Sequence, residues 1–327
     1  MRNIVIALLW AMLVASVLIL LYGESPLAVY QLMLERTWGD RYGLGQVVFR
    51  ATPLLFTGLA VGVAFRGGMF NIGGEGQLVA GSFLAAVAGT LLPPGLPAPL
   101  TVAICLACAA LGGGLTGALP GWLRARFGAH EVISTIMLNF IVAALALCAG
   151  RRWFFQAETV HTAPIVDGAR LPPLSAIFGD GTAASGAFLI ALAIAVAVEL
   201  WSRRSRRAFE LRALGQNPLA AEAGGVRVAA TTIWVMTLSG ALAGLAAAGT
   251  VLGYKGYFEE GLGSGAGFMG IAVALLGRGR PIAVIPSALL FATLAQGGLA
   301  ANAVVPKEII EVIQAVIILA LAWRGSR

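Results

Sequence analysis

The stretch FRGGMFNIGGEGQL, residues 65–78, separates two strongly apolar runs in a chain of 327 residues. It holds five glycines together with an arginine, an asparagine, a glutamate and a glutamine. Inside a membrane, a helix can break only where neighbouring groups satisfy the backbone N–H and C=O groups that the break frees. The stretch therefore predicts two membrane helices separated by a break over residues 66–76 that is partly embedded in the bilayer.

The composition of the whole chain is that of a protein whose solvent is mostly lipid. Hydrophobic residues make up 59% and charged residues 11% of it, and the mean hydropathy is +0.88. A bilayer core of about 30 Å needs about 20 apolar residues per helix. Apolar spans lie at about 3–22, 46–65, 77–92, 100–122, 132–149, 186–201, 229–250, 267–277, 282–300 and 308–323. We expect an all-α, polytopic membrane protein of about 10 transmembrane helices, some of them broken or short, in one domain over residues 1–327.

The distribution of lysine and arginine sets the orientation, because these residues prefer the cytoplasmic side. If the N-terminus is cytoplasmic and the ten spans alternate, 14 of the 22 basic residues fall in cytoplasmic segments and 7 in external ones. Both termini are therefore expected in the cytoplasm, with an external loop at about 150–185 and a cytoplasmic loop at about 202–228. The first 22 residues exceed the roughly 7 to 15 of a signal-peptide core, so we expect a retained helix.

The sequence offers no catalytic, cofactor or metal site of its own. A P-loop needs G-K-[ST], whereas Lys255 and Lys307, the two lysines, precede glycine and glutamate. The two histidines, His130 and His161, fall on opposite sides of the membrane in the predicted topology. The C-x-x-C at 105–108 lies within an apolar span, where small apolar packing residues are the simpler interpretation. We expect a transporter without its own ATPase site rather than a membrane enzyme.

An ion-coupled secondary transporter of a small polar solute is the alternative. Such proteins use broken helices near the bilayer midplane and bind the coupling ion with ionisable residues in the membrane. Of the candidate carboxylates, Glu199 and Glu311 lie near helix ends. Only Glu75 has a polar sequence context.

The cytoplasmic loop predicts a short helix that could dock into a partner protein. Asn217 and Pro218 can open a helix as N-cap and first residue, and Gly224 or Gly225 can end it about two turns later. Small residues between them would let the helix lie in a groove. The candidate coupling residues are Gly215, Asn217, Pro218, Ala220, Ala221, Glu222 and Gly224.

Four stretches together resemble the permease subunits of bacterial ABC importers, in the branch of ribose-type sugar and nucleoside permeases. They are FRGGMFNIGGEGQLVAGSFLAA (65–86), GAHEVISTIMLNFI (128–141), RALGQNPLAAEAGGV (212–226) and GFMGIAVALLGRGRP (267–281). They follow the family's order and span most of residues 46–300. RALGQNPLAAEAGGV is similar to the family's coupling segment.

The resemblance implies a permease of the bacterial inner membrane that works in pairs, with an identical or a sister chain. It also implies cytoplasmic ATPase subunits that bind ATP and Mg, and an extracytoplasmic solute-binding protein. The implied solute is a nucleoside or a simple sugar. The G-E-G-Q form at 74–77 is more similar to nucleoside-type members than to the ribose type, where Asp-Leu-Ser is expected after Gly-Gly-Ile.

Phe70, Asn71, Glu75 and Gln77 are the candidates to line or gate the solute pathway. The alternative is that Asn71, Glu75 and Gln77 satisfy backbone groups at the helix break. Asn139 and Gln296 lie in apolar spans and predict interhelical hydrogen bonds. Gly240 and Gly244 have the small-x-x-x-small spacing of a close helix contact, and we expect a packing seam there.

Overall fold

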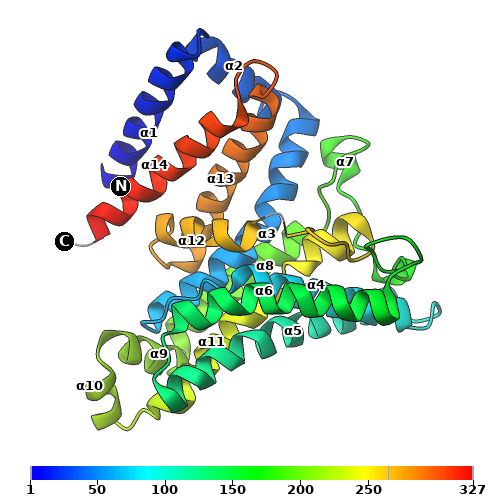
Figure 1. Ribbon diagram of the computed structural model, residues 1–327, viewed down its shortest axis with the longest axis vertical. Helices are drawn as coiled ribbons and strands as arrows, with labels where there is room; N and C mark the ends of the chain where they lie inside the picture. Colours follow the sequence, from blue (N-terminus) through cyan, green and yellow to red (C-terminus); the bar gives the residue numbers. More distant parts are fainter. Residues whose placement is uncertain (1, 264, 326–327) are drawn as a thin grey trace.

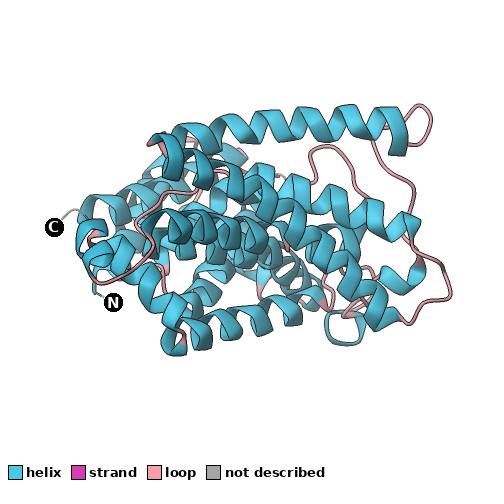
Figure 2. Cartoon of the chain, turned by 90° about the horizontal axis from the view of Figure 1, so that it is seen from below, coloured by secondary structure: helices cyan, strands magenta, loops and turns pink. Residues whose placement is uncertain are grey.

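All ten predicted membrane segments are helices in the computed structural model, which describes residues 2–263 and 265–325 (Figure 1). They are α1 (Arg2–Leu21), α3 (Arg41–Arg66), α4 (Gly74–Leu91), α5 (Ala98–Phe127), α6 (Glu131–Ala149), α8 (Ala187–Arg204), α11 (Val228–Gly244), α12 (Ala266–Leu276), α13 (Pro281–Ala301) and α14 (Lys307–Gly325). No β-strand occurs over the described ranges, which consist of helices joined by loops (Figure 2). The all-α, polytopic architecture is confirmed.

Five helices are individually long and apolar enough to cross a membrane, among the described residues. They are α3, α5, α6 with its π-helical continuation η1 (Gly150–Phe154), α11 with its π-helical continuation η3 (Ala248–Lys255), and α13. α12 has only 11 residues, about 17 Å at 1.5 Å per residue, and is too short to span alone.

Two helices were not expected from the sequence. α2 (Pro26–Thr37) follows α1 at a bend of 115° and packs against α13. Its buried residues are Val29, Met33 and Thr37, spaced four apart, so one narrow apolar stripe holds it in place. The polar residues between them hide this helix from a search for long apolar runs. α9 (Arg206–Gln216) likewise carries a basic run but buries Leu211 and Leu214.

The remaining short elements lie in two loops. The external loop carries a 3-10 turn, η2 (Asp167–Ala169), and α7 (Ser175–Phe178). An isolated bridge between His161 and Glu259 ties this loop to the segment after η3. The cytoplasmic loop carries α9 and the six-residue α10 (Pro218–Ala223).

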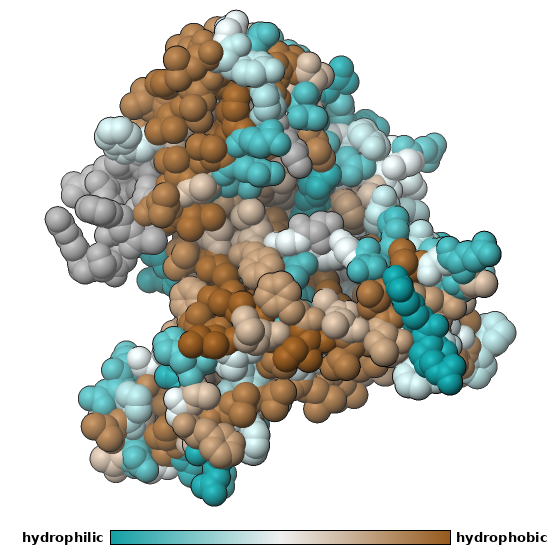
Figure 3. Space-filling view, viewed as in Figure 1, coloured by the Kyte–Doolittle hydropathy of each residue, from teal (hydrophilic) through white to brown (hydrophobic). Residues whose placement is uncertain are grey.

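α3 is the central helix of the bundle. In the most apolar 18-residue stretch of α3, 78% is buried within this chain, whereas the corresponding share is 22% for the span that contains α6. Neighbours α4, α8, α11, α12 and α13 all contact it. α6 and the outer side of α5 instead expose large apolar residues, as do α1 and α14 at the other edge (Figure 3).

The polar regions lie on two opposite sides of this apolar body. In Figure 1 both termini, α9 and α10 lie on the left, whereas α7 and the external loop lie on the right. Figure 3 shows hydrophilic side chains gathered at the lower left and along the right, with hydrophobic ones between them. This distribution fits a membrane-spanning body with the termini and the coupling loop on one side.

Glycines form the tightest helix contact, between α5 and α11. A Cβ on Gly240 would collide with the backbone of Gly113, and one on Gly244 with the carbonyl oxygen of Ala109. Gly117 meets the same stretch of α11. The predicted packing seam at Gly240 and Gly244 is therefore confirmed, and it lies inside this chain.

We expect Gly113→Ala to destabilise the protein by about 1–3 kcal/mol, the usual cost of overpacking a tight contact. The added methyl group would meet the Gly240 carbonyl oxygen, which belongs to a helix backbone and cannot rotate away. The matched control is Gly114→Ala, where the nearest atoms are 3.5 Å away. The measurement is the Tm of the detergent-purified protein. An equal Tm for both variants would contradict this role of Gly113.

Candidate functional site

The break predicted from the opening stretch lies between α3 and α4. α3 ends at Arg66, α4 begins at Gly74, and residues 67–73 are not helical. Gly68 adopts φ +69°, a left-handed conformation that favours glycine. Most of the segment is buried, so its free backbone groups need partners from the protein.

Asn71 and Gln77 form a reciprocal amide pair inside the break. Asn71 Nδ2 donates to Gln77 Oε1 at 2.8 Å, and Gln77 Nε2 donates to Asn71 Oδ1 at 3.1 Å. Asn71 Oδ1 also accepts from the backbone N–H of Gly73 at 2.9 Å. Both side chains are essentially inaccessible, with 0% and 1% of their surface exposed. They bridge the two ends of the break and start α4 in a fixed direction.

Ser239 connects this pair to two further helices. Its hydroxyl accepts from Asn71 Nδ2 at 2.7 Å and donates to the carbonyl oxygen of Ala60 at 2.7 Å. Ser239 belongs to α11 and Ala60 to α3. The amide pair is therefore fixed to the same helix whose glycines pack against α5.

One face of α6 supplies a ladder of polar side chains to the break. Glu131 accepts from the backbone N–H of Phe70 at 3.2 Å, and Thr135 from that of Ile72 at 3.3 Å. Asn139 Oδ1 accepts from Gly76 N–H at 2.8 Å, while its Nδ2 donates to the Ile72 carbonyl at 3.0 Å. The interhelical hydrogen bonds predicted for Asn139 are thus confirmed.

Glu131 and Thr135 are the residues that sequence reasoning missed. Glu131 lies in the first turn of α6, is 6% exposed and forms an ion pair with Arg124 of α5. The signal was present in the spacing of Glu131, Thr135 and Asn139, each four residues apart and so on one helix face. A polar stripe on an otherwise apolar helix indicates a polar partner.

Glu75 joins the start of α4 to the start of α12. Its carboxylate accepts from the backbone N–H of Gly267 at 2.8 Å and from that of Gly265 at 3.2 Å. Gly267 and Gly74 touch at their backbones, so a Cβ on Gly267 would collide with this part of α4. The N-termini of the two helices therefore meet at one carboxylate.

This meeting of N-termini has a clear electrostatic cause. Each helix N-terminus carries a partial positive charge of about half an elementary charge, so two of them repel when they are in contact. The Glu75 carboxylate lies in the first turn of α4 and at the N-terminus of α12, so its negative charge stabilises both N-termini. α4 and α12 extend to opposite sides from this point, α12 toward the left and α4 toward the right in Figure 1.

Phe70 is the fourth residue predicted for the solute pathway. Its ring is partly buried and packs on that of Phe65, with centroids 4.8 Å apart. The structure thus brings Phe70, Asn71, Glu75 and Gln77 together in one segment. Asn71, Glu75 and Gln77 form the hydrogen bonds expected if they satisfy backbone groups at the helix break. Their role in lining or gating the solute pathway stays a prediction.

α9 and α10 form a unit, called here the coupling unit, that projects on the side of the termini (Figure 1). Asn217 accepts from the backbone N–H groups of Leu219 and Ala220 at 3.0 and 3.1 Å, and Pro218 is the first helical residue. α10 ends at Ala223, before Gly225 at φ +86°. The predicted helix opening and ending are confirmed.

The surface of α10 is mostly free within this chain. Ala221 and Val226 are its inward anchors, with 5% and 8% exposed. The exposed residues are Asn217, Pro218, Leu219, Ala220, Glu222, Ala223 and Gly224, and Leu219 is 79% exposed. An exposed leucine on a small-faced helix outside the apolar belt is typical of a surface that a partner covers.

Gly215 brings the coupling unit into direct contact with the break. A Cβ on Gly215 would collide with the carbonyl oxygen of Arg66 and lie 2.8 Å from the backbone nitrogen of Gly68. One on Gly68 would lie 2.9 Å from Cα of Gly215. Backbone therefore touches backbone here, with no flexible side chain between α9 and the end of α3.

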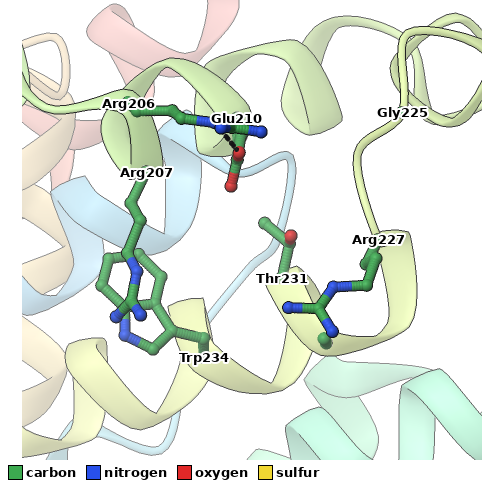
Figure 4. A pocket seen from close by; sticks show the side chains of 8 residues that line it. Arg206, Arg207, Glu210, Gly225, Arg227, Thr231 and Trp234 are labelled. Carbon is green, nitrogen blue, oxygen red and sulfur yellow. Dashed lines mark hydrogen bonds and ion pairs between the residues drawn. The ribbon is translucent and has the colours of Figure 1, made fainter.

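A basic pocket of about 530 Å³ opens between α9 and α11 (Figure 4). Its charged lining residues are Arg206, Arg207, Glu210 and Arg227. Arg206 is paired with Glu210 at 2.9 Å, and the Arg207 guanidinium lies 5.6 Å from the centre of the Trp234 ring. Three arginines face one glutamate, so this side of the coupling unit attracts acidic groups. Within the described ranges, no cluster of three or more potential metal-ligating residues occurs.

Comparison with known proteins places this chain in a family. A family model described as branched-chain amino acid transport system / permease component matches residues 43–322. The guanosine ABC transporter permease protein of Bacillus subtilis is 36% identical over 97% of this chain and 91% of its own length. No solved structure matches the chain.

Two further relatives cover the chain almost completely. The glucose ABC transporter permease protein of Haloferax volcanii is 32% identical over 97% of this chain and 86% of its own length. The nucleoside ABC transporter permease protein of Lactococcus lactis is 31% identical over 97% of this chain and 89% of its own length.

We expect Glu75→Gln to lower the free energy of unfolding by about 1–3 kcal/mol, because a single amide oxygen replaces a carboxylate that serves two N–H groups. The uncharged amide also leaves the two helix N-termini without a compensating negative charge. The measurement is the Tm of the purified protein. Glu35→Gln is the control, since Glu35 is exposed on α2. A Tm equal to that of the parent protein would contradict the joining role of Glu75.

Proposed function

The chain belongs to the branched-chain amino acid transport system / permease component family and is a multi-pass, inner-membrane permease subunit of an ATP-binding-cassette importer, and we propose that its solute is a nucleoside. The observation that carries the solute class is the G-E-G-Q form at 74–77, together with a guanosine and a nucleoside permease among the relatives. A simple sugar is the second candidate, because a glucose permease is 32% identical.

ABC importers of this family work with ATPase subunits and a solute-binding protein. In our proposal this chain binds neither ATP nor Mg, which the separate cytoplasmic ATPase subunits hold, and it has no catalytic residue. It pairs with a second permease, an identical or a sister chain. The chain acts as one permease domain over residues 1–327, surrounded by membrane lipid.

The coupling unit is where the ATPase subunit acts in this proposal. α10 lies in a groove of the ATPase, and Gly215, Asn217, Pro218, Ala220, Ala221, Glu222 and Gly224 form or position the docking surface. The support is the exposed face of α10 and the arginine-rich pocket beside it, which suits acidic groups of a partner. Closure of the ATPase dimer on ATP would then displace α9 and α10 together.

The displacement would reach the membrane through Gly215. Because Gly215 lies directly against Arg66 and Gly68, a shift of α9 has to move the end of α3 or the break itself. From there hydrogen bonds lead through Asn71 to Ser239 and through Glu75 to α12. α4 and α12 would tilt about their shared N-termini and open the pathway to the other side, with Phe70 next to it.

Nothing in the family or the geometry favours the ion-coupled alternative. Its candidate ion ligand was Glu75, and both carboxylate oxygens of Glu75 accept backbone N–H groups. An acceptor that already caps a helix is a poor ligand for an exchangeable cation.

In the reconstituted complex, the solute-loaded binding protein stimulates ATPase activity. We expect Asn217→Ala to lower this stimulated activity by a factor of at least five. The loss of the N-cap costs about 0.5–2 kcal/mol, which is enough to unravel a six-residue helix. Gln216→Ala, an exposed neighbour in α9, is the control and should behave as the parent. Complexes are checked for intact subunit composition. Undiminished stimulation in an intact complex would contradict the coupling role of Asn217.

Uptake into proteoliposomes tests the solute class. With the binding protein outside and ATP inside, we expect radiolabelled inosine or adenosine to be taken up at least tenfold faster than glucose. Collapse of the ion gradients should leave this rate unchanged, and omission of ATP should abolish it. Glucose uptake without nucleoside uptake would replace the proposed solute, and uptake that needs an ion gradient but no ATP would overturn the mechanism.

A further inference from the structure

Arg50 is a charged residue within α3, one of the two most buried membrane spans among the described residues. α3 begins at Arg41 and, in the predicted topology, runs inward from the external side. Arg50 then lies nine residues, about 14 Å, along its axis. The 26 residues of α3 extend about 39 Å. If the helix is centred in a core of about 30 Å, Arg50 lies about 9 Å inside the external boundary. This depth is within the outer half of the membrane.

Arg50 has one polar side-chain partner among the described residues. Its Nε donates to Oε1 of Gln296 in α13 at 2.9 Å, which confirms the interhelical bond predicted for Gln296. None of the ion pairs found over the described ranges includes Arg50. A guanidinium has five N–H donors, and this bond uses the one at Nε. Gln296 therefore fixes the plane of the guanidinium and leaves its terminal edge available.

Such a group does not face lipid. Arginines within membrane spans face the interior of a bundle or a water-filled cavity and mark ion or substrate paths. Arg50 is only partly buried, and no carboxylate of the described residues forms an ion pair with it. We propose that Arg50, positioned by Gln296, lines the outer half of the solute pathway and forms a subsite for a planar heterocyclic base, the chemistry of a 6-oxopurine nucleoside. The ligand class rests on the proposed nucleoside import.

Tyr254 supplies the aromatic surface of this subsite. It belongs to the π-helix η3, a geometry frequent at functional sites, and 49% of it is exposed. Its ring packs on that of Phe49, the residue before Arg50 in α3, with centroids 4.7 Å apart. Any nucleobase can stack on an aromatic side chain, because every base has a π-face. Tyr254 therefore holds the base by its face, and Arg50 reads its edge.

The terminal edge of arginine selects between purines. It presents two parallel N–H donors, which match the O6 and N7 acceptors of a 6-oxopurine. A 6-aminopurine presents an N–H donor at position 6, which faces a donor of Arg50 and gains no bond there. The subsite accordingly prefers inosine or guanosine to adenosine.

Water access to Arg50 is tested by cysteine labelling in the assembled transporter, with the three native cysteines replaced by alanine. Arg50→Cys and Tyr254→Cys are treated with a membrane-impermeant cationic methanethiosulfonate reagent from outside. Leu145→Cys is the matched control, because it lies nine residues from the external end of its span and is 61% exposed on α6. We expect both site cysteines to react at least tenfold faster than Leu145→Cys. Equal rates would overturn the placement in the pathway.

The ligand chemistry is tested by protection of Tyr254→Cys. With Arg50 present, excess inosine should slow labelling at least threefold more than the same concentration of adenosine. Both Arg50→Gln and Arg50→Lys should remove this difference, since lysine keeps the charge but lacks the planar fork. Equal protection by the two nucleosides, including none by either, would overturn the subsite, as would a difference that persists in Arg50→Gln.

The two proposals can fail separately. A transporter that imports nucleosides but shows no difference in protection keeps the proposed function and loses the subsite. A transporter that imports only glucose loses the proposed solute, while fast labelling of Arg50→Cys still places Arg50 in the pathway.

Discussion

The fold depends on the need to satisfy backbone hydrogen bonds where α3 stops inside the bundle. A buried N–H or C=O group without a partner costs several kcal/mol in a membrane. The break at 67–73 is possible because Asn71 and Gln77 serve it from within, while Glu131, Thr135 and Asn139 serve it from α6. The polar side chains in this otherwise apolar sequence are thus what makes the helix break at 67–73 possible.

The same segment connects regions that are far apart in the sequence. Asn71 reaches Ser239 in α11, Glu75 reaches the start of α12, and Gly68 touches Gly215 of α9. A helical break therefore provides a junction between the coupling unit and a short helix inside the membrane. Continuous helices could not provide it, because their backbone groups are already used within each helix. At Gly215 backbone touches backbone, so no flexible side chain separates α9 from the end of α3.

Charge has two different uses in the membrane part of this permease. Glu75 compensates two helix N-termini, and both its oxygens are engaged, so it is a structural charge. Among the described residues Arg50 has one neutral hydrogen-bond partner, Gln296, which binds its Nε. The first charge stabilises the meeting of α4 and α12. The second is expensive to keep unless it contacts water or solute.

Local composition and spacings of a few residues were sufficient to predict the membrane class, the ten helical segments and the capped helix at Asn217. The sequence also located the break at 65–78. The contacts of the polar residues in that break could not be predicted from the sequence, since the partners of Asn71 and Glu75 lie 168 and 192 residues away in α11 and α12. The four-residue spacing of Glu131, Thr135 and Asn139 indicates a polar partner, but not that this partner is the break between α3 and α4. α2 was missed because polar residues separate the few buried ones that hold it against α13.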